Sequence, residues 1–220
     1  MTDMPLYEAM STLRAVRRLR PDPIADDVLH RVVVAATWAP TGGNVQPWRV
    51  VVVRGDTQKK GLAALYAPRW RAYTAHYRGL MEGQPAEAID RSDRTLAAGD
   101  YLADHFAEAP AILVFCFNPE IMAITDAEQD RPSVVGGGSV YPAVQNALLA
   151  ARAEGLGCVL TTLLCQEEPA VRELLEIPDP WYTAAAIPLG WPVGGGHGPI
   201  RRRPAAKMAF ADTWGAPYSG

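Results

Sequence analysis

Two groups of residues in this chain have the types and spacing to bind a flat or anionic ligand. The first lies near the N-terminus, where four arginines, among them Arg14 and Arg17, fall between positions 14 and 20. Each guanidinium presents a planar fork of donors and stays protonated, so such a cluster suits a phosphate or a carboxylate. A solvated helix end would produce the same pattern, and the cluster alone does not decide between the two.

The second group is the loop between Trp38 and Trp48. Pro40 ends the preceding helical pattern, and Gly42 with its neighbouring glycine permits positive φ or a close backbone approach. Asn44 then offers a side-chain amide between large rings. We interpret the stretch as a binding loop for a flat polar ligand; a plain helix-to-strand turn is the alternative.

The elements that must position these groups follow from hydrophobic periodicity. Apolar residues at helical spacing predict a helix from about 26 to 38, and the β-branched run that follows predicts a buried strand. The run Ala111–Phe117 is apolar throughout, which is typical of a central strand. We predict a short helix at the start of 6–20 and helices over 26–38, 58–66, 140–154 and 167–176. Strands are predicted over 48–54, 111–117, 158–162 and 183–189, with Ser139 as the N-cap of the helix over 140–154.

A polar pair, Thr161 and Thr162, ends one predicted buried strand just before Leu163. Strand ends of this kind often meet ligands, although threonines are also ordinary strand formers. The glycines at 136–138 precede a helix but are not followed by a dinucleotide or P-loop fingerprint, so we expect a flexible connection there.

Two segments have no clear pattern. Residues 67–108 are mostly polar with scattered aromatic side chains, and we expect a helical insertion that either covers a site as a lid or packs on the domain. Residues 193–220 contain glycines and the basic run 201–203 and are predicted to form an extended arm.

Length, composition and charge limit the classes of protein to which this chain can belong. The chain has 220 residues, 49% of them hydrophobic, which suits a single domain over 1–220. No uncharged run is long enough for a membrane span, and the acid and proline at the start are unlike a signal peptide, so we expect a cytoplasmic protein. A net charge of −3 argues against nucleic acid as a partner.

Metal binding is not expected. The three cysteines form no CxxC pair and lie in apolar runs, which favours buried thiols. The four histidines are scattered without the spacing of a metal site.

Four segments in the right order resemble the nitroreductase family of FMN-dependent oxidoreductases. They are 14–23, 39–48, 145–157 and the stretch 189–192 followed by 201–204. The resemblance implies an α+β fold with a mixed central sheet flanked by helices, and an interlocked homodimer with FMN at the interface.

The resemblance also assigns residues to FMN. Arg14, Ala15 and Arg17 match the family's N-terminal positions, with Arg17 near the pyrimidine edge of the flavin. The loop of the partner subunit contributes Pro40, Thr41, Gly42 and Asn44. Thr161, Thr162 and Leu163 match the segment beside flavin N5, and Arg201 and Arg203 match the tail that closes on the phosphate.

Three departures from the family pattern stand out. Leu13 and Ala15 occupy positions where the family commonly has an arginine and a serine for the phosphate, so the tail must carry more of that binding. Leu163 stands where a glycine is often found. The segment 67–108 matches no family motif, and we expect substrate choice to reside there.

The resemblance implies transfer of hydride from NADPH or NADH through FMN to an electron-poor acceptor, such as a nitroaromatic, a quinone or an activated alkene, in two separate steps. A positive group near N1 would stabilise the reduced anionic ring. No side chain is expected to act as a dedicated acid, base or nucleophile. The alternatives are flavin fragmentation, dehalogenation or dehydrogenation on the same fold, and a non-enzymatic flavin binder.

Overall fold

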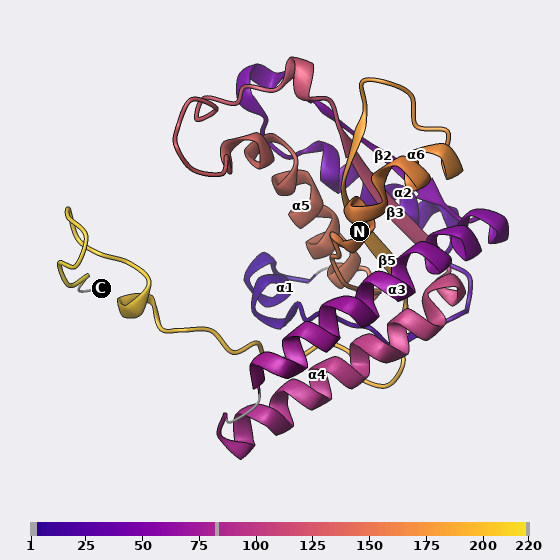
Figure 1. The fold of residues 1–220 in the computed structure, drawn as a ribbon, viewed down its shortest axis with the longest axis horizontal. Coiled ribbons are helices and arrows are strands. Elements are labelled where there is room, and N and C mark those ends of the chain that lie inside the picture. The colour runs from indigo at the N-terminus through magenta and orange to yellow at the C-terminus, as the bar shows by residue number, and fades with distance from the viewer. Residues whose placement is uncertain (1–3, 82–83, 219–220) are drawn as a thin grey trace.

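The central feature is an antiparallel sheet in strand order β1, β5, β3, β2, with β4 paired to β5 (Figure 1). This computed structural model describes residues 4–81 and 84–218. The single domain was predicted to span 1–220, and both of these end positions lie outside the described residues. Positions 82–83 of the 67–108 segment lie outside them as well. The helices are α1 (Leu6–Thr12), α2 (Asp26–Thr37), α3 (Asp56–Met81), α4 (Ala86–His105), α5 (Tyr141–Ala153) and α6 (Glu168–Leu174); the strands are β1 (Leu19–Arg20), β2 (Trp48–Val53), β3 (Ala111–Phe117), β4 (Gly157–Cys158) and β5 (Tyr182–Pro192).

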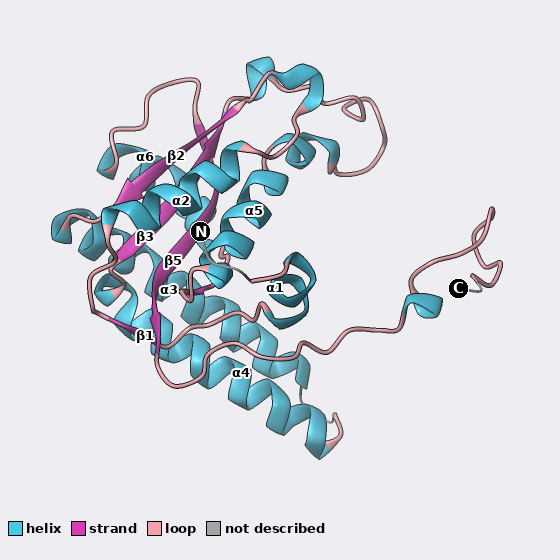
Figure 2. Cartoon of the chain, turned by 180° about the vertical axis from the view of Figure 1, so that it is seen from behind, coloured by secondary structure: helices cyan, strands magenta, loops and turns pink. Residues whose placement is uncertain are grey.

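Strand β3 lies between β2 and β5 and is buried on both faces, as its uninterrupted apolar run predicted. Alternate side chains point to opposite faces of a strand. Leu113 and Phe115 therefore join the core beneath α2 and α5, whereas Ile112 and Val114 join the core beneath α3 and α4. The sheet is thus covered by helices on both faces (Figure 2).

The α+β class is confirmed, with one difference in the sheet. All four strand pairs of the described chain are antiparallel, whereas the expectation was a mixture of parallel and antiparallel pairs. The long strand β5 contacts β1, β3 and β4, so it organises the sheet as much as β3 does.

Helix α3 is much longer than predicted. The pattern indicated one helix over 58–66 and a separate helical insertion over 67–108. Pro68 lacks a backbone donor and would usually break a helix. The helix instead continues through Pro68 to Met81. Burial of Trp70 and Thr74 at helical spacing from Tyr66 keeps the second half of α3 against the protein.

Two other predictions of local structure were wrong. Helix α5 begins at Tyr141, and Ser139 is not its N-cap; the Ser139 hydroxyl instead accepts a hydrogen bond from the Gly42 N–H at 3.2 Å. The strand predicted over 158–162 is only two residues long, although Thr161 still forms an isolated bridge with Ala186.

The C-terminal segment first follows the N-terminal part of the chain and then leaves it. The N–H groups of Gly198 and Ile200 donate to the carbonyl groups of Thr12 and Ser11, at 3.1 Å each. Farther on, the arm extends away from the body of the protein, as both ribbon views show (Figures 1 and 2).

Candidate active site

Arg17 is the cation at the centre of the candidate site. The neighbouring residue Val16 is buried and donates its N–H to the Cys158 carbonyl at 2.9 Å, which fixes the backbone beside β4. Burial lowers the pKa of the Arg17 guanidinium, against the opposing influence of the Tyr66 and Tyr73 phenols. Within the described part of the chain, Arg17 forms no hydrogen bond or ion pair with any other residue.

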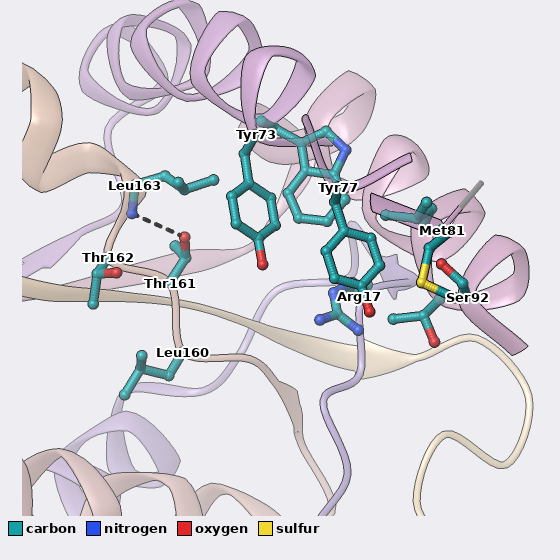
Figure 3. A pocket seen from close by; sticks show the side chains of 12 residues that line it. Arg17, Tyr73, Tyr77, Met81, Ser92, Leu160, Thr161, Thr162 and Leu163 are labelled. Carbon is teal, nitrogen blue, oxygen red and sulfur yellow. Dashed lines mark hydrogen bonds between the residues drawn. The ribbon is translucent and has the colours of Figure 1, made fainter. Parts of the chain in front are cut away.

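Thr161, Thr162 and Leu163 line the same cavity as Arg17. Backbone hydrogen bonds of 2.9 and 2.8 Å tie Thr161 to Ala186 on β5. The Leu163 N–H donates to the Thr161 hydroxyl at 3.3 Å (Figure 3). This segment therefore presents a constrained backbone turn at the edge of the sheet.

Tyr66 supports the same turn from α3. Its ring is buried, and burial raises the pKa of its phenol to about 12, partly offset by a hydrogen bond with the Thr161 hydroxyl and by the charge of Arg17. Tyr66 therefore remains a neutral hydroxyl at any physiological pH and positions Thr161.

These residues open onto a cavity of about 590 Å³ between the sheet edge and the two long helices, within the usual size range for a small-molecule site (Figure 3). Aromatic rings from α3 form one wall: the Trp70 and Tyr73 centroids are 5.9 Å apart, and those of Tyr73 and Tyr77 are 6.3 Å apart. The full lining is Arg17, Trp70, Tyr73, Tyr77, Met81, Ser92, Thr95, Leu96, Leu160, Thr161, Thr162 and Leu163.

The aromatic wall is held in place from α4. The Trp70 indole N–H donates to one carboxylate oxygen of Asp100 at 2.8 Å, and Arg78 donates to the other at 2.9 Å. Gly99 makes the close approach feasible, because a Cβ at that position would lie 1.9 Å from the Trp70 ring. The α3–α4 pair thus forms a fixed side of the cavity.

The loop expected to bind the ligand lies elsewhere on the same chain. Gly43 and Asn44 have φ of 58° and 55°, and the Thr41 hydroxyl accepts a hydrogen bond from the Gln46 N–H at 3.0 Å. Pro40, Gly42 and Asn44 are exposed, and no residue of the loop lines the cavity beside Arg17. The loop is shaped as predicted but faces outward.

The remaining predicted cations are not brought to the cavity within one chain. Arg14 is exposed, and its Nε and Nη2 donate to the Pro199 carbonyl at 3.1 and 2.6 Å. Ala15 is also exposed, and Arg201 and Arg203 lie exposed on the arm. The structure therefore unites Arg17 with 161–163 but separates both from Arg201 and Arg203.

The sequence predicted that the segment 67–108 would cover a site or pack on the domain, but it did not single out the cavity residues of α3 and α4. Tyr66, Trp70, Tyr73 and Tyr77 recur at the spacing of one helix face. That signal could have marked an aromatic stripe, but the predicted helix ended at Tyr66 and the aromatic residues after it were interpreted as scattered. Ser92 had no distinguishing pattern.

The described residues contain no group of three or more His, Cys, Asp or Glu side chains arranged to hold a metal ion. Burial raises the pKa of the Cys116 and Cys158 thiols to about 12. None of the helices within the described residues combines the length and the apolar character needed to cross a membrane.

The sequence pattern described as "Nitroreductase family" matches residues 12–191, which include Arg17, the exposed loop and the 161–163 turn. The chain belongs to the nitroreductase family. Membership is decided by that match, which spans most of the chain and every element of the sheet except the last residue of β5.

Individual members of the family resemble the chain along most of its length. A protein named NADH dehydrogenase from Thermus thermophilus is 27% identical over 90% of this chain and 91% of its own. A 5,6-dimethylbenzimidazole synthase from Rhodospirillum rubrum is 31% identical over 81% and 78%. A putative nitroreductase from Desulfovibrio desulfuricans, solved in complex with FMN, shares the fold with a TM-score of 0.68 at 24% identity, covering 97% and 99% of the two chains.

Proposed function

We propose that this nitroreductase-family protein is an FMN-dependent oxidoreductase that takes electrons from NADH or NADPH and passes them to a small electron-poor acceptor. The observation that carries the proposal is the position of Arg17, a half-buried guanidinium without a partner in the described chain, beside the 161–163 turn and an aromatic wall. A desolvated, unpaired cation is costly unless a ligand supplies negative charge or acceptor atoms.

The residues present fit the ring of a flavin. Arg17 would donate to the acceptor atoms of the pyrimidine edge and stabilise negative charge that develops there. The Leu163 N–H, whose present bond to Thr161 is long at 3.3 Å, is available as a donor beside the ring. FMN held there would supply two-electron redox chemistry between the nicotinamide and the acceptor. The chain's own groups bind, orient and shield the ring.

The residues expected to bind the FMN phosphate are not gathered within one chain, which supports a homodimer. Leu13 and Ala15 offer no donor side chain, and Arg14 already binds the Pro199 carbonyl. The arm with Arg201 and Arg203 points away from its own cavity, and the 40–44 loop is exposed. We infer that these elements complete the site of a second copy of the chain.

An apolar surface suited to that second copy lies on the face made by α1, α2 and α5. A groove of about 480 Å³ runs there, and it is lined by residues that include Leu6, Trp38, Leu149 and Ala150. The Leu6 side chain is 63% exposed and Trp38 is 69% exposed. Large apolar side chains gathered on one face are typical of an interaction surface.

The decisive experiment is a visible spectrum of the purified protein, followed by anaerobic addition of NADH or NADPH and then menadione. We expect a flavin spectrum that bleaches with a nicotinamide and returns with the quinone. A protein that binds FMN but is reduced by neither nicotinamide would favour a non-enzymatic flavin binder. A protein that cannot be loaded with FMN would overturn the proposal.

The role of the arm has its own test. The double variant Arg201→Ala, Arg203→Ala should weaken FMN binding by about 10- to 100-fold, the loss of charge-assisted hydrogen bonds to a phosphate. Lys207→Ala, another exposed cation of the arm, is the control and should leave the affinity unchanged. Unchanged FMN retention in the double variant would show that the arm does not hold the phosphate.

One second candidate is favoured by a specific relative, the 5,6-dimethylbenzimidazole synthase at 31% identity. If this chain shares that activity, protein loaded with reduced FMN and exposed to oxygen will release 5,6-dimethylbenzimidazole. Intact FMN at the end of the incubation would exclude it.

A further inference from the structure

The Ser92 side chain on α4 is a buried polar group that the proposed chemistry does not use. The residue is only 8% exposed, and its hydroxyl has no hydrogen-bond partner among the described residues. It nevertheless lines the same cavity as Arg17 and the 161–163 turn. Figure 3 shows Ser92 next to Met81, on the opposite side of the view from Thr162 and Leu163, with Tyr73 and Tyr77 between them.

An unsatisfied hydroxyl at this position is unusual. A serine inside a helix ordinarily turns its hydroxyl to the carbonyl one turn earlier or to solvent. A buried hydroxyl without a partner costs about 1–3 kcal/mol, and buried polar groups are satisfied in the great majority of cases. Ser92 lines a cavity large enough for a ligand. Its hydroxyl oxygen is enclosed, so a rotation of the side chain about χ1 toward the cavity would let a ligand atom supply the missing partner.

The surroundings of Ser92 restrict what that ligand can be. The rings of Trp70, Tyr73 and Tyr77 form one wall of the cavity, and the thioether of Met81 lies beside the hydroxyl (Figure 3). Flat rings stack on such a wall, and a thioether packs favourably against an aromatic edge. The wall therefore favours a planar aromatic compound, and the hydroxyl requires a polar substituent on it.

The α3–α4 side of the cavity belongs to the segment where substrate choice was expected, and within it we propose that Ser92 selects acceptors carrying a hydrogen-bonding substituent remote from the group that is reduced. This inference rests on the proposed function, because it assigns Arg17 and the 161–163 turn to the flavin and leaves Ser92 for the second ligand. A site built to bond such a substituent discriminates against analogues that lack it, since the buried hydroxyl then stays unpaired.

A matched pair of acceptors tests the subsite. Nitrobenzene and 4-nitrobenzamide carry the same reducible group, and only the second has a polar substituent at the far end of the ring. Comparing each variant with the unaltered protein, acceptor by acceptor, cancels their different intrinsic reactivities. We expect Ser92→Ala to lower kcat/KM for 4-nitrobenzamide by about three- to tenfold, the worth of one hydrogen bond.

Three further results are expected from the same proposal. With nitrobenzene, Ser92→Ala should match or exceed the unaltered protein. Ser92→Thr, which retains a hydroxyl, should keep the preference for 4-nitrobenzamide. Ser11→Ala, which removes an exposed hydroxyl on α1, should change neither acceptor.

Equilibrium binding gives a readout that does not depend on turnover. Benzamide cannot be reduced by the flavin, and its binding to the oxidised, FMN-loaded protein can be followed by tryptophan fluorescence. The dissociation constant for benzamide should rise three- to tenfold in Ser92→Ala, while that for FMN stays unchanged.

Two outcomes would overturn the inference while leaving the oxidoreductase proposal intact. If Ser92→Ala changes kcat/KM equally for both acceptors, or for neither, Ser92 does not bind the polar substituent. A loss of FMN affinity in Ser92→Ala would mean that the hydroxyl contacts the flavin. Failure of the protein to bind FMN at all would instead overturn the proposed function, and benzamide binding to the flavin-free protein would then decide the subsite by itself.

Discussion

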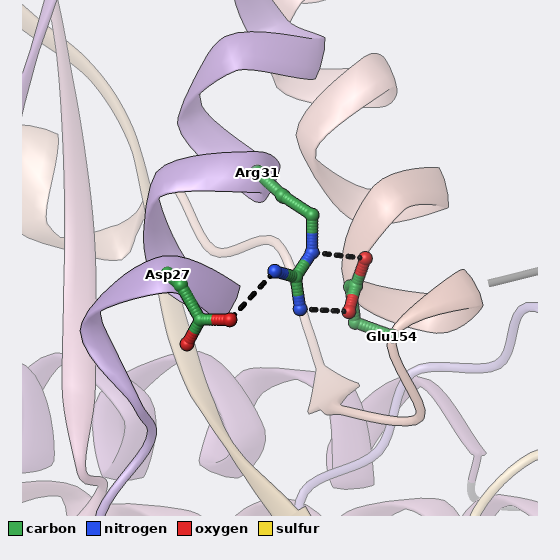
Figure 4. A network of polar contacts seen from close by, with 3 residues as sticks. All are labelled: Asp27, Arg31 and Glu154. Atoms are coloured by element: carbon green, nitrogen blue, oxygen red, sulfur yellow. Dashed lines mark hydrogen bonds and ion pairs between the residues drawn. The ribbon is translucent and has the colours of Figure 1, made fainter. Parts of the chain in front are cut away.

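Arg31 on α2 binds Glu154 at the end of α5 through two hydrogen bonds of 2.9 Å, from Nε to one carboxylate oxygen and from Nη2 to the other (Figure 4). Nη1 of the same guanidinium donates to Asp27 at 2.8 Å. Both Arg31 and Glu154 border the apolar groove proposed as the subunit contact. The pair therefore ties together the two helices that cover one face of the sheet.

Replacing Glu154 should measure how much the Arg31–Glu154 pair contributes to the stability of the fold. The hydrogen bonds from Arg31 lower the pKa of the Glu154 carboxyl. Its stabilising contribution is therefore complete above the pKa of an unfolded glutamate and is lost as pH falls through the lower folded value. We expect Glu154→Gln to lower the melting temperature by about 2–4 °C at pH 7, with the difference shrinking in acid. Asp27→Asn is the control, because the Asp27 side chain is 70% exposed and its pair should matter little.

Gly99 should be intolerant of any side chain. A Cβ there would overlap the Trp70 ring, so Gly99→Ala must push α4 from α3 or displace the indole from Asp100. Overpacking of this kind costs about 1–3 kcal/mol, measurable by urea unfolding. Gly79→Ala is the matched control on α3: nothing lies within 4 Å of its Cβ, and alanine favours the helix by up to about 1 kcal/mol. A Gly99→Ala protein as stable as Gly79→Ala would contradict the described packing.

Asp126 should hold the connection between β3 and α5 in a pH-dependent way. Its buried carboxylate accepts hydrogen bonds from the Ser133 hydroxyl at 2.6 Å, the Val134 N–H at 3.2 Å and Arg131 at 2.7 Å. These bonds, that of Ser133 foremost, lower the pKa of the carboxyl to about 2. The stabilisation is thus present above about pH 4, the unfolded value, and is lost as pH falls toward 2.

Hydrogen exchange of residues 126–134 measures that effect. Protection should fall on acidification from pH 4 to pH 2 in the unaltered protein, after correction for intrinsic exchange rates. Asp126→Asn should show weak protection at both pH values. Equal protection of the two proteins at pH 4 would show that the carboxylate does not hold this segment.

Arg17 should affect both the affinity for FMN and its redox potential. Arg17→Met keeps the length of the side chain but removes the charge proposed to lie at the pyrimidine edge. We expect FMN binding to weaken by about 10- to 100-fold, and the midpoint potential to fall by about 30 mV for each 1.4 kcal/mol of stabilisation lost from the reduced ring.

Arg18→Met is the control for Arg17→Met. Arg18 is the next residue in sequence, but its guanidinium lies over the Tyr101 ring at 4.5 Å and does not line the cavity. Equal FMN affinities and potentials in the two variants would remove Arg17 from the site.

The thiols should differ in reactivity. Cys116 and Cys158 are buried, with pKa values raised to about 12, and should not react with a thiol reagent in the native state. Cys165 is partly exposed, although burial also raises its pKa. Native protein should therefore label slowly at Cys165 alone, as mass spectrometry of peptides can check, and at all three thiols after denaturation. Rapid native labelling of Cys158 would contradict its place in the core.

Much of the fold was predictable because it depends on local patterns. The apolar run of β3 indicated a central strand, and the spacing of apolar residues in α2 indicated one buried helix face. The two glycines of the loop were expected to permit positive φ or a close backbone approach, and Gly43 has a φ of 58°. In each case the determining interactions lie within a few residues of sequence, where side-chain identity and backbone sterics are sufficient.

Tertiary packing decided which residues line the cavity. Helix α3 continues past Pro68 because Trp70 and Thr74 are buried, and only that continuation brings Tyr73 and Tyr77 over Arg17. The Ser139 hydroxyl binds Gly42, 97 positions away, instead of capping its own helix. A side chain's partner depends on which distant segment the fold places beside it, and one sequence without its three-dimensional packing holds no local signal for that choice.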